Sequence, residues 1–135
     1  MTQHHPSRDA AGFTLLEVLI AAAVVVILLM IALPSYLAQM RKSHRGSAES
    51  HLMDIAARQQ QYLFDNRAYA PDIATLNMTT PSDVSAFYTI SISTAAGPPP
   101  SFTASATPIG SQRLDLGGAA LTLSNTGAKT PVGVW

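Results

Sequence analysis

The chain has 135 residues and a mass of 14.3 kDa, and its eight Lys and Arg balance eight Asp and Glu, so the formal net charge is zero. This length favours one small domain. With 12% charged and 47% apolar residues, the composition excludes a charge-rich disordered chain and a polyelectrolyte that holds nucleic acid by its overall field. Because the chain has no cysteine, a disulfide framework, a thiolate zinc site and a cysteine nucleophile are excluded as well.

Apolar residues are concentrated in one segment near the N-terminus. From Phe13 to Leu33 only Thr14 and Glu17 interrupt the apolar run, which as a helix would span roughly 30 Å at about 1.5 Å per residue. The run is longer than the apolar core of a cleavable secretory signal, roughly 7 to 15 residues. We therefore expect a retained membrane-spanning helix, with signal cleavage near Ala32-Leu33-Pro34 as the alternative.

A second helical pattern follows Pro34. Apolar residues recur there mostly every three or four positions with basic residues between them, which is typical of an amphipathic helix. Pro71 limits its length, because proline lacks an amide donor and disfavours helix in the preceding residue. We predict one long helix from Phe13 to about Phe64. The apolar positions of its second part are Leu37, Met40, Ala48, Leu52, Ile55, Tyr62 and Leu63.

The second half of the chain is rich in Thr, Ser, Gly and Pro and predicts a sheet. The alternation within Phe87–Ser93 indicates a strand, and further strands are expected at Phe102–Thr107, at Ala120–Ser124 and near Thr130–Val134. We expect loops at residues 71–85 and 108–119. Helix and sheet each have one apolar face, so each is expected to cover the other. The prediction is an α+β head with an antiparallel meander on a membrane stem.

Glu17 and Pro34 are anomalous in an apolar helix. A carboxylate at the bilayer centre costs at least a few kcal/mol. Glu17 therefore lies near the helix start, where the macrodipole favours an anion, or pairs with a positive group of a neighbouring chain. Pro34 cannot donate to the carbonyl of Met30. It either ends the helix or kinks it, and the pattern that resumes at Leu37 favours a kink.

The residues Gly12-Phe13-Thr14-Leu15-Leu16-Glu17-Val18, the apolar run and Pro34 together resemble the N-terminal signature of type IV pilins and of the related pseudopilins of type II secretion. The resemblance implies that residues 1–12 are a leader, which a membrane-embedded prepilin peptidase removes by cutting after Gly12. Phe13 then becomes the N-methylated first residue. The resemblance also implies that Glu17 meets the N-terminal amine of a neighbouring subunit, and that the stem bends or melts around Pro34 in filaments.

The C-terminal half is similar to the head of minor pilins. The resemblance implies a pilin fold with a transmembrane and filament-core helix at 13–34 and a globular head at 35–135 that includes the amphipathic half of the helix. These relatives usually have cysteines at the positions of Gly118 and Val134, and Ala11 stands where Lys or Arg is common. We expect packing to hold the C-terminal loop. The residues that carry the similarity are Phe102–Pro108, Gln112, Asp115, Leu121-Thr122-Leu123, Gly127 and Trp135, of which Gly127 and Trp135 are the expected anchors.

The function that this resemblance implies is that of a structural subunit, most closely a minor pilin, of a type IV pilus that supports adhesion, twitching motility or DNA uptake. The implied partners are other pilin subunits, the prepilin peptidase, the pilus assembly platform and, before assembly, the inner membrane. No specific nucleic-acid site is evident. The implied location is the bacterial inner membrane, in a single pass with the leader inside and the head outside, and then an extracellular pilus or a periplasmic pseudopilus.

The basic cluster Arg41, Lys42 and Arg45 lies on the head side of the apolar run and opposes this orientation by the positive-inside rule. We expect the cluster to serve subunit contacts instead. Two alternatives to a pilus subunit stay open, a type II secretion pseudopilin and a single-span anchored binding module that does not polymerise.

Nothing in the sequence indicates an enzyme, a cofactor or a metal. No HExxH, GxSxG, P-loop or GxGxxG pattern is present, and no histidine follows His51. His44 and His51 are seven residues apart, with no carboxylate to complete a metal set, so we expect them on a solvated helix face. The aromatic residues around the change from helix to sheet are expected in the core, namely Tyr62, Phe64, Tyr69, Phe87 and Tyr88.

Overall fold

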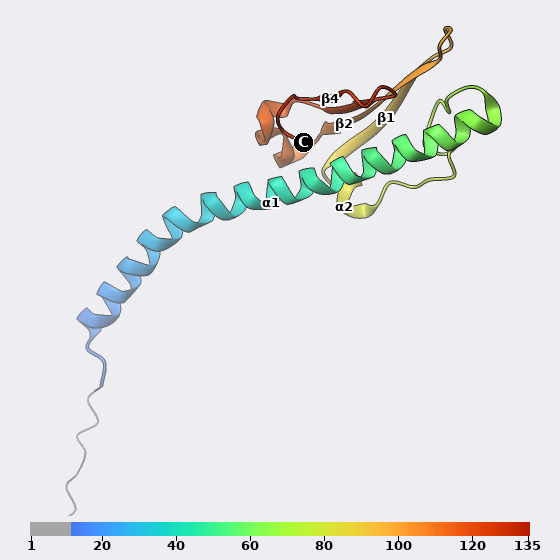
Figure 1. The fold of residues 1–135 in the computed structure, drawn as a ribbon. Coiled ribbons are helices and arrows are strands. Elements are labelled where there is room, and N and C mark those ends of the chain that lie inside the picture. The colour runs from blue at the N-terminus through green and yellow to red at the C-terminus, as the bar shows by residue number, and fades with distance from the viewer. Residues whose placement is uncertain (1–11) are drawn as a thin grey trace, which may run out of the picture. The chain divides into compact units, whose positions relative to one another are not determined.

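The computed structural model describes residues 12–135 (Figure 1). The chain divides into two compact units, one ending at Leu37 and one running from Ala38 to Trp135. The elements, in chain order, are helices α1 (Leu15–Asn66) and α2 (Ser82–Ser85), strands β1 (Tyr88–Ala95) and β2 (Ser101–Pro108), the 3-10 turns η1 (Gly110–Leu114) and η2 (Leu116–Gly118), and strands β3 (Leu121–Ser124) and β4 (Lys129–Thr130). A long helix followed by a four-stranded antiparallel sheet confirms the predicted α+β class.

Helix α1 ends where the backbone turns left-handed. Arg67 has φ 56°, and its amide donates to the carbonyl of Leu63 at 2.8 Å, which is the capping pattern of a helix C-terminus. The side-chain amide of Asn66 donates to the carbonyl of Tyr62 at 3.1 Å. These two bonds satisfy carbonyls of the last turn, so the helix ends at Asn66, two residues beyond the predicted end and well before Pro71.

The sheet is a meander in the order β1-β2-β3-β4, with every neighbouring pair antiparallel. In register, Tyr88 lies opposite Pro108 and Ala106 opposite Leu121. Along β2 the buried positions alternate with half-buried ones, as period-two side-chain placement requires when one face is covered. The sheet therefore presents one apolar face toward α1.

The core lies between that sheet face and the second part of α1. Ala104 and Ala106 occupy the central strand, and their short side chains leave room for a helix to approach. The fully or almost fully buried apolar residues are Ala48, Leu52, Ile55, Ala70, Leu76, Val84, Tyr88, Phe102, Ala104, Ala106, Leu121 and Leu123. This core holds the head together.

Three sequence predictions about the head are wrong in detail. Phe64 is 84% exposed, because it lies five residues after buried Gln59, about 140° around the helix. The last strand stops at Thr130, since Pro131 has no amide to continue the ladder. The segments expected to be loops contain short helical turns, namely α2, η1 and η2.

Candidate functional site

The predicted cleavage site lies just outside α1. Gly12, Phe13 and Thr14 are not helical, and Phe13 is 84% exposed. The hydroxyl oxygen of Thr14 accepts a hydrogen bond from the amide of Glu17 at 3.2 Å, and its carbonyl accepts from Val18. Thr14 is thus the N-cap, in a Thr-x-x-Glu pattern typical of a capping box. The bond between Gly12 and Phe13 is therefore in non-helical, exposed backbone, while residues 1–11 of the predicted leader lie outside the described residues.

Glu17 lies in the first turn of α1. The unpaired amides of a helix N-terminus favour an anion there. Within residues 12–135 its carboxylate has no ion-pair partner. Its first-turn position agrees with the helix-start interpretation and leaves the carboxylate exposed for a group of another chain, so the pairing role of Glu17 stays a prediction.

Pro34 lies inside α1 rather than at its end. Helix continues on both sides of it, so ending the helix is not its role. The missing amide of Pro34 leaves the carbonyl of Met30 without its usual helical donor. The helix is therefore locally less stable at Pro34 than it would be with a residue that has a backbone amide at this position.

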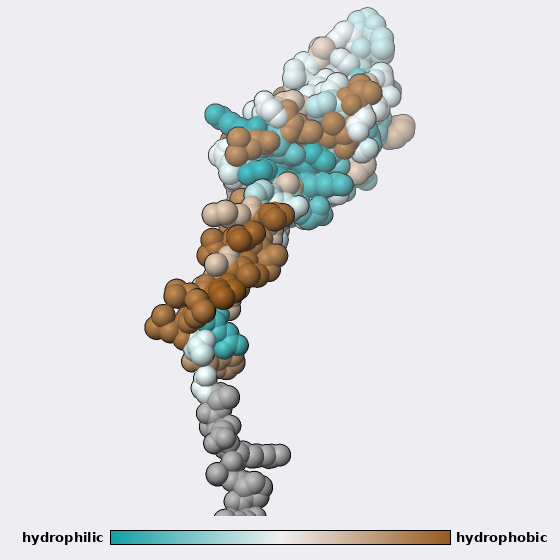
Figure 2. Space-filling view, turned by 90° about the vertical axis from the view of Figure 1, so that its left-hand side faces the viewer, coloured by the Kyte–Doolittle hydropathy of each residue, from teal (hydrophilic) through white to brown (hydrophobic). Residues whose placement is uncertain are grey.

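The first part of α1 has an apolar surface that is exposed in the part of the chain that the structure describes. Its best window has a mean hydropathy of 3.0 and none of it is buried, and the helix is long and apolar enough to cross a membrane. Figure 2 shows apolar residues over this part of the helix on the face in view. Leu15, Ile20 and Ile31, among others, are more than half exposed. Such a surface needs lipid or other apolar helices around it.

A polar cluster ties η1 and η2 to α1 in the head. Arg45 donates to both carboxylate oxygens of Asp115, at 3.1 and 3.0 Å, and its Nε lies 3.5 Å from the carboxylate of Glu49. Gln112, which is buried, donates to the carbonyl of Arg41 and to the hydroxyl of Tyr88, both at 2.9 Å. The bonds from Arg45 to Asp115 and from Gln112 to the carbonyl of Arg41 join residues 70 and 71 positions apart and fix the C-terminal half on the helix.

Burial changes the pKa values of two groups in this cluster. It raises the pKa of Glu49 above its ordinary value, although the charges of Arg45 and Lys129 act to lower it. It also raises the pKa of Tyr88, against the hydrogen bond from Gln112. A raised carboxyl pKa means that the folded head binds this proton more tightly than the unfolded chain does. The contribution of Glu49 to stability is therefore largest at acidic pH and declines as pH rises through the folded-state pKa.

The C-terminus is held without a covalent link. The indole nitrogen of Trp135 donates to the carbonyl of Thr130 at 2.9 Å, and the ammonium of Lys129 lies 4.8 Å from the Trp135 ring centroid. The turn before β4 closes through the amide of Gly127, which donates to the carbonyl of Ser124 and has φ 80°. Trp135 and Gly127 thus anchor the segment as expected from the sequence.

The two helix histidines are not on a solvated face, so that prediction is wrong. His44 is half-buried and stacks on Phe87 with ring centroids 3.6 Å apart. His51 is 5% exposed, and its Nε2 has no hydrogen-bond partner among residues 12–135. Burial lowers the pKa of His51, while the charges of Asp54 and Asp83 raise it. No group of three or more His, Asp or Glu residues within 12–135 could hold a metal.

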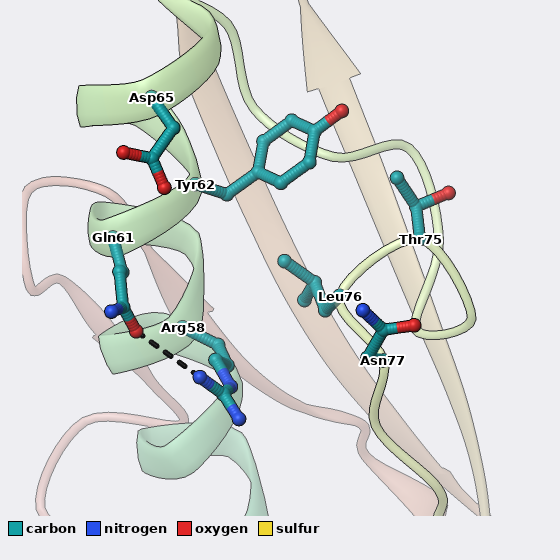
Figure 3. Close-up of a pocket in the computed structure, with 7 residues that line it drawn as sticks. All are labelled: Arg58, Gln61, Tyr62, Asp65, Thr75, Leu76 and Asn77. Carbon is teal, nitrogen blue, oxygen red and sulfur yellow. Dashed lines mark hydrogen bonds between the residues drawn. The ribbon is translucent and has the colours of Figure 1, made fainter.

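A cavity of about 250 Å³ lies between the end of α1 and the following loop (Figure 3). In the figure, Tyr62 from the helix and Leu76 from the loop face each other, and Arg58 donates to the side chain of Gln61 at 3.1 Å. Arg58 and Asp65 are charged but exposed. The cavity is therefore an open groove on the surface of the head.

Gln59, Gln112 and Asp115 are structural residues that sequence reasoning did not assign a role. Gln59 is fully buried and both accepts from and donates to the backbone of Ala70, each bond at 2.8 Å. The sequence contains one signal for the role of Gln59. Gln59 lies four residues after Ile55, on the predicted apolar face of the helix, and a buried side-chain amide requires hydrogen-bond partners.

A pilin-like stem and head are therefore present together, and comparison with known proteins identifies the family. Residues 34–119 match the family model described as the type IV minor pilin ComP, DNA uptake sequence receptor. Residues 7–33 match the model of the prokaryotic N-terminal methylation motif. Since the first match covers well over half of the chain, the protein belongs to this type IV minor pilin family, whose members are structural proteins and not enzymes.

Two individual proteins are similar to the chain. The type IV wide pilus major component PilA4 of Thermus thermophilus is 35% identical over 69 residues, which are 51% of this chain and 53% of that protein. The chain thus spans about half the length of this curated relative. A type IV pilin structure from Shewanella oneidensis has a TM-score of 0.57 at 22% identity and covers 70% of this chain and 97% of its own, which supports the fold.

Proposed function

We propose that the protein is a minor subunit of a type IV pilus. Residues 13–34 anchor the subunit in the inner membrane before assembly and pack against other subunits in the filament. The main support for this proposal is the exposed apolar surface of α1, which follows directly after the capped start of the helix. In this proposal residues 1–12 are the leader, the prepilin peptidase cuts after Gly12, and Phe13 is methylated. The assembly platform and other pilin subunits are the partners.

Packing of stems against one another drives entry into the filament. Lipid and neighbouring stems are both apolar, so transfer between them changes the free energy less than transfer from water would. Charge pairing of Glu17 with the amine of a neighbouring Phe13 then fixes the axial register. Pro34 lets the stem adjust locally, because one helical hydrogen bond is already missing there.

The orientation in this proposal has the leader inside and the head outside, and its support is the match of residues 7–33 to the N-terminal methylation motif. The positive-inside rule counts Lys and Arg near the span and gives Asp and Glu little weight, so Arg41, Lys42 and Arg45 oppose this orientation. Arg45 pairs with Glu49 and Asp115 in the folded head, which gives this cation a structural role there.

Cleavage after Gly12 is the first testable step. We expect intact-mass and N-terminal peptide spectrometry of the membrane-extracted protein to find a chain that begins at Phe13 with one added methyl group. Gly12→Val is expected to leave the full-length precursor, because a branched side chain next to the cut bond obstructs the peptidase. Gly97→Val, at a loop glycine with open space around it, is the matched control. Retention of Met1 in the wild-type protein would overturn the proposal.

DNA uptake is the role we propose for the assembled subunit, ahead of adhesion or twitching motility. The support is the match over residues 34–119 to a family described as a DNA uptake sequence receptor. Residues 38–135 contain seven basic and six acidic residues, so the head has little overall field for DNA. Binding must therefore use a few exposed cations locally rather than net charge.

DNA binding should be measurable as a salt-dependent affinity of the full chain in detergent for short duplexes. The expected slope of log affinity against log salt is small, about −0.9 for each phosphate contact. Replacing one contacting residue by alanine should reduce the slope by about one unit. Affinity that does not depend on salt, or an unchanged slope in all variants, would contradict the proposal. The exposed cations to test are Lys42, Arg58, Arg67, Arg113 and Lys129.

A further inference from the structure

Three cations lie together where the head's part of α1 begins. Arg41 and Lys42 belong to the helix, and Arg113 comes from η1, far along the chain. The side-chain amide of Gln112 donates to the carbonyl of Arg41 at 2.9 Å, and this bond brings η1 onto the same helical turn. Arg41, Lys42 and Arg113 therefore form one basic surface, the basic end of the head.

None of the three cations has an ion-pair partner within residues 12–135. The carboxylates of Glu49 and Asp115, which belong to the neighbouring polar cluster, both pair with Arg45. The side chain of Arg113 donates only to a backbone carbonyl, at 3.4 Å, and both Lys42 and Arg113 are exposed. The basic end thus has unpaired positive charge, although the chain as a whole is neutral.

With residues 13–34 in a bilayer, the spacing along α1 puts Arg41 and Lys42 close to the lipid headgroups. The apolar run ends at Leu33, and Tyr36, which is 62% exposed, is of a residue type enriched at the membrane–water interface. The Cα atom of Arg41 is at most about 8 Å farther along the helix than that of Tyr36. Because Cα–Cβ bonds of a helix tilt toward its N-terminus, both long basic side chains can reach back toward the headgroups.

Anionic phospholipid is the partner that this surface fits. Its phosphate groups complement the three cations, and each basic residue near an anionic bilayer surface strengthens attachment roughly fivefold. Leu114, next to Arg113 in η1, is 72% exposed and supplies an apolar side chain for the boundary between headgroups and acyl chains. The basic end also continues directly from the membrane-spanning residues, so the covalent link keeps it beside the bilayer at high effective concentration.

We propose that the basic end of the head binds anionic lipid headgroups while the subunit is in the membrane before assembly. This inference rests on the proposed function, because it requires residues 13–34 to span the bilayer. The contact orients the head on the membrane surface and is lost when the subunit enters the filament. It also gives a role to cations that the positive-inside rule would place on the other side of the membrane.

The test uses the full chain in nanodiscs of phosphatidylcholine, either alone or with phosphatidylglycerol as about one third of the lipid. A trace of phosphatidylcholine with a nitroxide on its headgroup relaxes the backbone amides that come close to the lipid surface. We expect the paramagnetic relaxation of the η1 amides to be at least threefold larger in the anionic discs at low salt. At about 1 M salt, where the Debye length is about 3 Å, it should fall to the value found in the neutral discs.

Two matched double variants separate this surface from net charge. Lys42→Gln/Arg113→Gln is expected to lose most of the difference between anionic and neutral discs. Arg58→Gln/Arg67→Gln removes the same charge from exposed positions at the C-terminal end of α1 and should keep the difference. Lys42→Arg/Arg113→Lys retains both charges and should behave as the wild type.

Equal relaxation of the wild-type protein in both kinds of disc would overturn the inference, as would equal losses in the two double variants. If Lys42→Gln/Arg113→Gln weakens binding of a short DNA duplex and leaves the relaxation unchanged, the surface serves DNA and the lipid inference is wrong. The comparison of discs and salt uses the wild-type chain, so it decides the matter even if a variant does not fold. Cleavage at Phe13 in the same preparation tests the proposed function separately.

Discussion

Glu17→Gln is expected to reduce entry of the subunit into pili at least tenfold while leaving cleavage after Gly12 intact. The substitution keeps the size of the side chain and the backbone amide that donates to Thr14. It removes the negative charge that would pair with the amine of a neighbouring Phe13. Removing one partner of a buried ion pair costs about 3–5 kcal/mol, and about 1.4 kcal/mol corresponds to tenfold in an equilibrium. The measurement is the ratio of subunit in sheared pili to processed subunit in the membrane.

Two further variants separate charge from helix capping at this site. Thr14→Val removes the hydroxyl that accepts the amide of Glu17 and should have a much smaller effect, since an N-cap contributes about 0.5–2 kcal/mol. Glu17→Asp keeps the charge on a shorter side chain and should retain part of the assembly. If Glu17→Gln enters pili as well as the wild type, the proposed pairing of Glu17 with a neighbouring amine is wrong. If the wild-type subunit itself is absent from sheared pili, the non-polymerising anchored module becomes the better interpretation.

Gln59→Leu is expected to lower the free energy of unfolding of the head by about 2–5 kcal/mol. Gln59 is fully buried, and its amide makes two hydrogen bonds of 2.8 Å to the backbone of Ala70. Leucine has a similar size but leaves the amide and the carbonyl of Ala70 buried without partners, at about 1–3 kcal/mol each. Urea unfolding of the full chain in detergent, followed by the fluorescence of Trp135, measures the change.

The neighbouring residue provides a matched control. Gln60 is half-buried and makes one longer bond, 3.4 Å to the hydroxyl of Tyr69. Gln60→Leu makes the same chemical change one position along the helix and should cost less than about 1 kcal/mol. Equal losses for both variants would mean that the bonds to Ala70 do not stabilise the head.

The long helix and the sheet were predictable because their patterns are local. A continuous apolar run and period-two alternation each follow from one element meeting one environment. The N-terminal signature was also readable, since Gly12, Phe13 and Glu17 lie within six residues of one another. The structure places all three at an exposed helix start, while their roles in processing and assembly stay predictions.

The polar contacts of the head could not be predicted from the sequence, because they join distant segments. Arg45 appeared as part of a basic cluster, yet its partner Asp115 follows 70 residues later. His51 was expected on a solvated face because the segment of α2 that covers it has no periodic pattern of its own. Buried Gln59 and Gln112 are likewise intelligible only once the backbone groups that they meet are in place.

The attachment of the C-terminal segment has a mechanical consequence. Arg45 with Asp115, the indole of Trp135 and the two-residue strand β4 hold this segment to the head, and the sequence has no cysteine to add a covalent link. A covalent loop stays closed even when the rest of the head unfolds under load, whereas ion pairs and a few hydrogen bonds open and re-form. Pulling on the head can therefore peel this segment away reversibly, and its folding requires no oxidising enzyme.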